Sequence, residues 1–192
     1  MEISAVEYIV RLLGLPIAFA LDPFAPVLVF GLALRAGLIN DPYLLQPALA
    51  GFAGDGFLTL TLVLYVAHVV GDKIPPIAHT LDVIYLVLKP LAAAFVGFWM
   101  VSAVDSDGSL HVVALAVAVL GSITLTTGVH ATRSTLRLAA SAKSLGLLVP
   151  LISTIENFAA AVFAGLVIIR PELALVFLPR SSCQPYGCAT MW

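Results

Sequence analysis

The chain has 192 residues, of which 61% are hydrophobic and only 10% are charged, and its formal net charge is -2 at pH 7. Soluble domains carry about a quarter charged residues, so this composition and a mean hydropathy of +1.08 predict an integral membrane protein. There is no basic stripe, P-loop, glycine-rich dinucleotide motif or His-Glu-x-x-His motif. We therefore expect no nucleic-acid partner, no cofactor and no metal.

The first two apolar segments, near residues 4–20 and 24–39, are short and are separated by the sequence LDPFAP. Pro23 and Pro26 can stop one helix and open the next. This pair is predicted to be a broken helical hairpin whose tip lies inside the membrane. The N-terminus has neither the basic start nor the cleavage site of a signal peptide, so we expect it to belong to the mature fold.

Four longer apolar segments follow, near residues 46–71, 79–103, 109–131 and 146–169. Crossing a bilayer core of about 30 Å takes about 20 helical residues, whose backbone satisfies its own hydrogen bonds. We therefore predict an all-α polytopic membrane protein with four full transmembrane helices plus the proline-broken hairpin, up to six membrane segments. The connection DKIPPIAH is predicted to be a rigid turn, because Pro75 and Pro76 prevent helix continuation and hold the chain extended.

No linker divides the chain into separate domains. Residues 1–178 are therefore predicted to form a single transmembrane helical domain, with residues 179–192 as a C-terminal tail. In this tail the sequence CQPYGC places Cys183 and Cys188 close enough for a small disulfide loop. Two free thiols are an equally good interpretation.

Basic residues predict the orientation of the protein. Lys73 ends the third segment, and the basic residues after the fifth segment are Arg133, Arg137 and Lys143. The positive-inside rule predicts that this face is cytoplasmic and that both termini lie outside. We expect a multi-pass protein of the cell membrane, most simply the inner membrane of a bacterium. Lys73, Arg137 and Lys143 could also hold anionic lipid headgroups at about 1 kcal/mol each, although topological signalling alone is a sufficient explanation.

Two segments carry a polar stripe along one helix face. The stripe of the third segment consists of Thr61, Tyr65, His68 and Asp72, and that of the fifth consists of Ser122, Thr126, His130, Arg133 and Arg137. Because a polar stripe facing lipid would be costly, both stripes are predicted to face protein or a water-filled crevice. Interhelical hydrogen bonding, worth about 0.6 kcal/mol per group, is the simpler of the two alternatives.

Lys89 and Glu156 are predicted to form an ion pair near the bilayer midplane. Counted from the expected cytoplasmic starts of their helices at about 1.5 Å per residue, the two lie at similar depth. An unpaired charge there costs at least about 2.5–3.5 kcal/mol on insertion scales, and Asp55 is the competing partner for Lys89. Such a pair is compatible with a structural lock as well as with a transport site.

Four stretches resemble, in the same order, a known membrane-protein family. They are APVLVFGLALRAGL, VVGDKIPPIAHTLDVIYLVLKPLAAAF, TTGVHATRSTLRLAA and LISTIENFAAAVFAGLVIIRPELAL. The chain is similar, from about residue 20 to 178, to the family called domain of unknown function 4126. The resemblance implies a fold and no activity. Where the family pattern has a Glu and an Arg, this chain has His68 and Asp22, which implies an acid–base pair with exchanged signs if the two positions face each other.

These features predict transport or handling of a small solute or a lipid through a polar intramembrane crevice. Interrupted helices and midplane charges are typical of transporters. The predicted substrate-binding residues are Asp22, His68, Asp72, Lys89, His130, Arg133 and Glu156. The alternative is a non-catalytic accessory or scaffold subunit of a larger membrane complex, or a homo-oligomer, because LAAAFVG and ENFAAAVFAG permit close helix contacts. An enzyme is not expected, since only Ser122 or Thr126 near His130 resembles a nucleophile with its base.

Overall fold

The computed structural model describes residues 5–39, 44–45, 47–102, 109–144 and 149–174, and in these parts of the chain all regular structure is helical. The elements are α1 (Ala5–Leu21), α2 (Ala25–Arg35), the 3-10 helix η1 (Pro47–Ala53), α3 (Asp55–Gly71), α4 (Pro75–Ser102), α5 (Ser109–Ser144), α6 (Val149–Ile169) and α7 (Pro171–Ala174). The all-α class is therefore confirmed. The predicted tail, with Cys183 and Cys188, lies outside the described residues.

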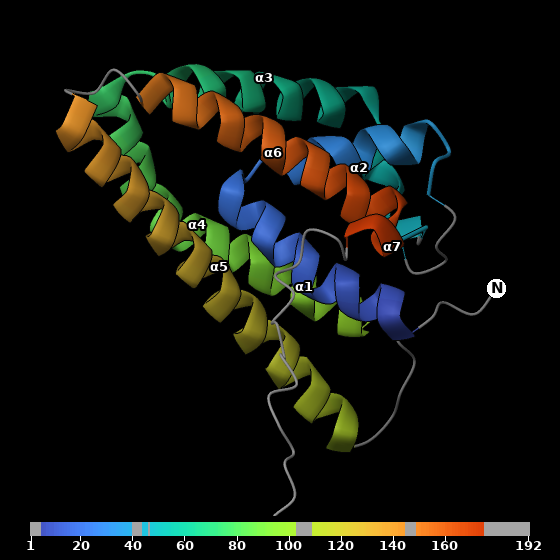
Figure 1. Ribbon diagram of the computed structural model, residues 1–192. Coiled ribbons are helices and arrows are strands. Elements are labelled where there is room, and N and C mark those ends of the chain that lie inside the picture. The colour runs from blue at the N-terminus through green and yellow to red at the C-terminus, as the bar shows by residue number, and fades with distance from the viewer. Residues whose placement is uncertain (1–4, 40–43, 46, 103–108, 145–148, 175–192) are drawn as a thin grey trace, which may run out of the picture.

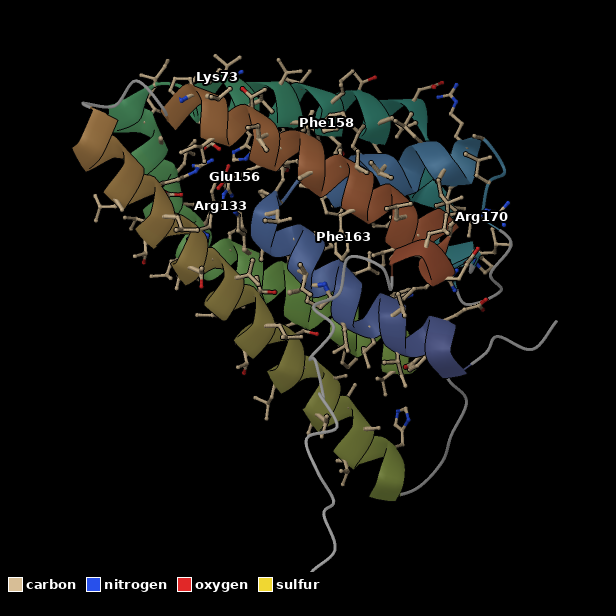
Figure 2. The ribbon with its side chains drawn as sticks, in the orientation of Figure 1. Lys73, Arg133, Glu156, Phe158, Phe163 and Arg170 are labelled. Atoms are coloured by element: carbon tan, nitrogen blue, oxygen red, sulfur yellow. The ribbon has the colours of Figure 1, made fainter. Side chains whose placement is uncertain are left out.

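Three helices are long and apolar enough to cross a membrane. The apolar stretches are Thr80–Ser102 in α4, His111–Ala139 in α5 and Pro150–Ile169 in α6. Large apolar side chains cover their outer faces, and Phe158 of α6, labelled in Figure 2, is 72% exposed. This distribution fits contact with lipid, because a soluble monomer rarely exposes so large an apolar surface.

The prediction of four full spans is wrong for the third segment. The expected helix near residues 46–71 is divided into η1 and α3, and α3 has only 17 residues. Gly54 lies at the division with an extended backbone, φ -70° and ψ 145°. Glycine is unfavourable inside a helix, so the α-helix begins only at Asp55, whose carboxylate suits a first helical turn.

Two helix boundaries also differ from the prediction. Pro75 and Pro76 are the first residues of α4, rather than an extended connection, because the N–H that proline lacks is unpaired at a helix start anyway. The fifth helix continues to Ser144 instead of ending near residue 131. Arg133 and Arg137 therefore lie on a helix and not in a loop, which decides where their side chains can reach.

The helices are arranged as a V (Figure 1). One arm consists of α4 and α5, which pack side by side, and the other consists of α6 with α2 and α3. Helix α1 lies between the arms, packs against α4, α5 and α6, and directs its C-terminal end toward the vertex. The turn between α3 and α4 lies at the vertex, where α5 ends and α6 begins. The end of α3, the start of α4, the end of α5, the start of α6 and the C-terminal end of α1 therefore converge at the vertex.

Small residues allow the helices to approach closely. A Cβ atom added at Gly97 of α4 would lie 2.6 Å from Ser122 Oγ and 2.9 Å from the Ala118 carbonyl oxygen of α5. In α6, Ala160 and Ala164 are completely buried. The buried members of the small-residue stretches LAAAFVG and ENFAAAVFAG thus serve contacts within this chain.

Candidate functional site

The site begins at the break between α1 and α2, where Asp22 is completely buried. Its Oδ1 accepts hydrogen bonds from the backbone N–H groups of Phe24, at 2.7 Å, and Ala25, at 2.8 Å. These groups belong to the start of α2, whose unpaired N–H groups and dipole favour a negative charge. The predicted proline-broken hairpin is therefore present, and a carboxylate caps its second helix.

The other side of the break presents carbonyl groups at the end of α1. Lys89 Nζ donates to the carbonyl oxygen of Ala20 at 2.8 Å and to that of Leu21 at 3.3 Å, and Arg133 Nη1 also donates to Leu21. The ammonium of Lys89 lies 5.2 Å from the ring centroid of Tyr85, a favourable cation–π distance. Two buried cations thus satisfy carbonyls that have no partner within α1, at the negative end of its dipole.

The predicted ion pair between Lys89 and Glu156 is wrong. Glu156 Oε2 instead pairs with Arg133 Nε at 2.7 Å and with Arg137 Nη2 at 2.6 Å, while Asp55 pairs with Arg35. Equal depth is not enough to bring Lys89 and Glu156 together, because α1 packs between their helices, α4 and α6.

Asp72, at the end of α3, shares the two arginines with Glu156. Its Oδ2 accepts from Arg137 Nη2 at 2.8 Å, from Arg133 Nη2 at 3.3 Å and from Ser153 Oγ at 3.2 Å. Burial by itself raises the pKa of the Asp72 carboxyl, but the hydrogen bond and charge of Arg137 bring that pKa below its ordinary value. Asp72 is therefore held as a carboxylate between two guanidinium groups.

His68 connects the break to Asp72. Its Nε2 lies 3.3 Å from Asp22 Oδ2 and 3.9 Å from Asp72 Oδ2, and its Nδ1 lies 2.9 Å from the hydroxyl of Tyr85. The imidazole is buried, and it packs against the rings of Phe24 and Tyr85 at centroid distances of 5.8 and 5.0 Å. The proximity of Asp22 and His68 that the departures from the family pattern implied is confirmed.

Six of the seven predicted substrate-binding residues thus meet in one group, which we call the charge cluster. Its members are Asp22, His68, Asp72, Lys89, Arg133 and Glu156, with Tyr85, Arg137 and Ser153. The seventh, His130, instead places Nε2 3.2 Å from the carbonyl oxygen of Asp82. As predicted, both polar stripes face protein, since Thr61, His68, Ser122, Thr126 and His130 are all buried.

The residues proposed to hold lipid headgroups differ in their exposure. Arg137 is buried in the charge cluster, because α5 continues past the position where a loop was expected. Lys73 is exposed and donates to Thr154 Oγ1 at 3.1 Å, and the side chain of Lys143 lies outside the described residues. Arg137 is paired with carboxylates of this chain, and the proposal that these residues hold lipid headgroups stays a prediction.

Two members of the cluster, Tyr85 and Ser153, were missed in the sequence. Tyr85 lies four residues before Lys89, and Ser153 lies three residues before Glu156. Such spacings place each pair on one helix face. The periodicity that revealed the stripes of the third and fifth segments would have found both residues if it had been applied to the fourth and sixth.

A groove between α5 and α6 leads to the cluster. It has a volume of about 490 Å³, its α5 wall includes Gly128, Thr132 and Leu136, and it reaches Arg133 and Glu156. Figure 2 shows Arg133 and Glu156 pointing toward each other between α5 and α6. The side chain of Glu156 is 18% exposed, so the cluster is accessible from the protein surface through this groove. Within the described ranges, no group of three His, Cys, Asp or Glu residues could hold a metal ion.

The fold and the cluster define the class: a membrane-like, all-helical protein with buried, paired charges at a helix break. Residues 9–180 match the family model described as domain of unknown function (DUF4126), and the chain belongs to that family, as its motifs implied. Neither the curated proteins nor the solved structures gave a match to this chain.

Proposed function

We propose that the protein transports or handles a small solute or a lipid in the cell membrane, through the groove between α5 and α6. One observation carries the proposal: the charge cluster lies at the α1–α2 break and borders an open groove. Transporters commonly bind their ligands near such breaks, where polar helix ends point at charged groups inside the membrane.

The number of buried charges supports a role beyond packing. Replacing a buried ion pair with apolar side chains of similar volume is often neutral or stabilising. A structural lock therefore does not require three buried cations, Lys89, Arg133 and Arg137, in one cluster. Ionisable residues within membrane segments are expensive and usually mark a pathway for ions or substrate.

The walls of the groove favour an amphipathic ligand. Leu125, Val129 and Leu136 are apolar, and the hydroxyl of Thr132 donates to the carbonyl oxygen of Gly128 in its own helix, so it is not available as a donor to a ligand. The polar groups stand at the end of the groove, where Glu156 is accessible. A ligand would place its apolar part along α5 and its polar head beside Glu156 and Arg133, as a lipid or an amphipathic solute does.

The accessory-subunit alternative rested on stretches of small residues. In α4 and α6 the buried members, among them Gly97 and Ala160, pack within this chain. The packing between α4 and α5 accounts for Gly97 within this chain, which weakens the argument for a partner protein at this stretch.

The experiment compares two glycine variants of α5. Both Gly128 and Gly121 have open space where a Cβ atom would be added, but only Gly128 lines the groove. Wild type, Gly128→Phe and Gly121→Phe are purified with their native lipids, and mass spectrometry identifies what co-purifies. We expect a reproducible bound lipid or solute in wild type and in the Gly121 variant, and its loss in the Gly128 variant.

Two outcomes would contradict the proposal. If the Gly128→Phe variant retains the bound molecule at wild-type occupancy, the ligand does not occupy the groove. If no small molecule co-purifies and a stoichiometric protein does, the accessory-subunit function replaces the transport function.

A further inference from the structure

We propose that His68 is a proton-binding site that couples protonation to the helix break at Asp22. Its imidazole is almost completely enclosed, at 3% exposure. It stands between a carboxylate from the break, Asp22, a carboxylate at the end of its own helix, Asp72, and a hydroxyl from α4, Tyr85. Histidine is the side chain whose charge most readily changes near neutral pH.

The surroundings of His68 accommodate both protonation states. Nε2 faces Asp22 Oδ2 at 3.3 Å, so this nitrogen carries a proton in either state, since a lone pair there would face a carboxylate. Nδ1 faces the hydroxyl of Tyr85 at 2.9 Å. A tyrosine hydroxyl can donate to a neutral ring nitrogen or accept from a protonated one. The second proton, taken from water, therefore binds at Nδ1.

The charged groups around His68 are arranged to receive a proton on its ring. Two carboxylates lie within 4 Å of the imidazole, Asp22 at 3.3 Å and Asp72 at 3.9 Å from Nε2. The nearby guanidinium groups of Arg133 and Arg137 are paired with Asp72 and Glu156. His68 also lies in the last turn of α3, where the helix dipole stabilises a cation.

The link to the break runs through the two oxygens of Asp22. Oδ1 accepts from Phe24 and Ala25 and so holds the start of α2. Oδ2 has no hydrogen bond within the described residues and faces His68. A positive charge on His68 strengthens the attraction between α3 and the break, and loss of that charge weakens it. Resting on the proposed function, this step would make ligand handling depend on protons.

The test follows the histidines of the full chain by nuclear magnetic resonance. The protein has four histidines, and selective ¹⁵N labelling reports the protonation of each between pH 5 and 8. We expect the signal that is lost in His68→Gln to report a change of protonation in this range, and the control His111→Gln, at the start of α5, to leave that signal in place.

Asp22→Asn provides a second variant that does not depend on the folding of His68→Gln. Asparagine keeps an oxygen for the N–H groups of α2 but removes the negative charge beside His68. We expect the titration of the His68 signal to shift to lower pH in this variant. A His68 signal that does not change between pH 5 and 8 in wild type, or an unchanged titration in Asp22→Asn, would overturn the proposal.

The two proposals fail separately. The titration requires no ligand, so a negative result leaves the groove between α5 and α6 as proposed, and the Gly128→Phe result leaves the proton site as proposed. The link between the two proposals is tested by the occupancy of the co-purified ligand, measured at pH 5 and pH 8. This occupancy should differ between the two pH values in wild type and be the same at both in Asp22→Asn. A pH effect that persists in this variant excludes the coupling through Asp22.

Discussion

At the scale of residues, the arginines of α5 hold the cluster together. Arg133 contacts Leu21, Asp72 and Glu156, and it thereby joins α1, α3 and α6. Arg137 contacts the same two carboxylates. Because each guanidinium serves two carboxylates, removing one partner leaves the other charges buried without full compensation.

The first prediction compares two double-mutant cycles. Arg137→Met and Glu156→Gln should show a coupling energy of about 0.5–3 kcal/mol, because these side chains are in direct contact. Lys89→Met and Glu156→Gln should show a smaller coupling energy, because Lys89 bonds to α1 and is linked to Glu156 only indirectly, through Leu21 and Arg133. The free energy of unfolding in detergent micelles is measured for every variant. If the coupling energy of Lys89 and Glu156 were the larger of the two, these side chains would be in direct contact, which would contradict the structure.

At the scale of elements, the break between α1 and α2 determines the chemistry of the site. It frees carbonyls at one helix end and N–H groups at the next, and both sets are satisfied by buried charges. An unbroken helix would pair these groups internally and would have no need for Lys89 or Asp22. The break therefore explains why charged side chains are retained in an otherwise apolar interior.

The second prediction concerns the contact between α4 and α5. Gly97→Ala should destabilise the protein by about 1–3 kcal/mol, because the added Cβ would lie 2.9 Å from the Ala118 carbonyl oxygen, a backbone atom that cannot easily move. The control is Gly121→Ala, where no atom lies within 4 Å, and it should stabilise α5 by up to about 1 kcal/mol. Unfolding of both variants in the same detergent is compared. Equal effects would mean that helix propensity alone governs both positions.

At the scale of the whole molecule, the V brings one end of the long helices together. The hydrogen bond from Lys73 to Thr154 links the α3–α4 turn to the start of α6, and Figure 2 shows Arg170 at the far end of α6. The cluster lies near the vertex, at the face that the positive-inside rule predicts to be cytoplasmic. We therefore predict that the groove leads to the cluster from the cytoplasmic side of the membrane.

The third prediction tests this orientation by cysteine labelling. Cys183 and Cys188 are first replaced by Ser, and single cysteines are then introduced at the exposed positions Lys73 and Ser102. A membrane-impermeant reagent added from outside should label the cysteine at position 102 and leave the one at position 73 unmodified until the membrane is permeabilised. The reverse pattern would place the vertex outside and would invert the proposed access to the cluster.

The sequence by itself determined the helical class, the family and the inward direction of the polar stripes. Hydropathy and a period of 3.6 residues report on each helix separately, and a lipid-facing Asp72 or His130 would be too costly. The division at Gly54 was also visible in the sequence, but an apolar average over 20 residues conceals single glycines. The departures from the family pattern at Asp22 and His68 were informative because they concern two positions together. They predicted that these two residues face each other.

Only the tertiary structure decided which charges are partners. Periodicity and depth specify where a side chain lies along and around its own helix, but not which helix stands beside it. Lys89 and Glu156 have matching depth, yet α1 packs between their helices and receives Lys89 on its terminal carbonyls. Glu156 is thereby left to the arginines of α5. The lateral order of helices depends on packing over the whole chain, and the spacing of residues within one segment carries no information about it.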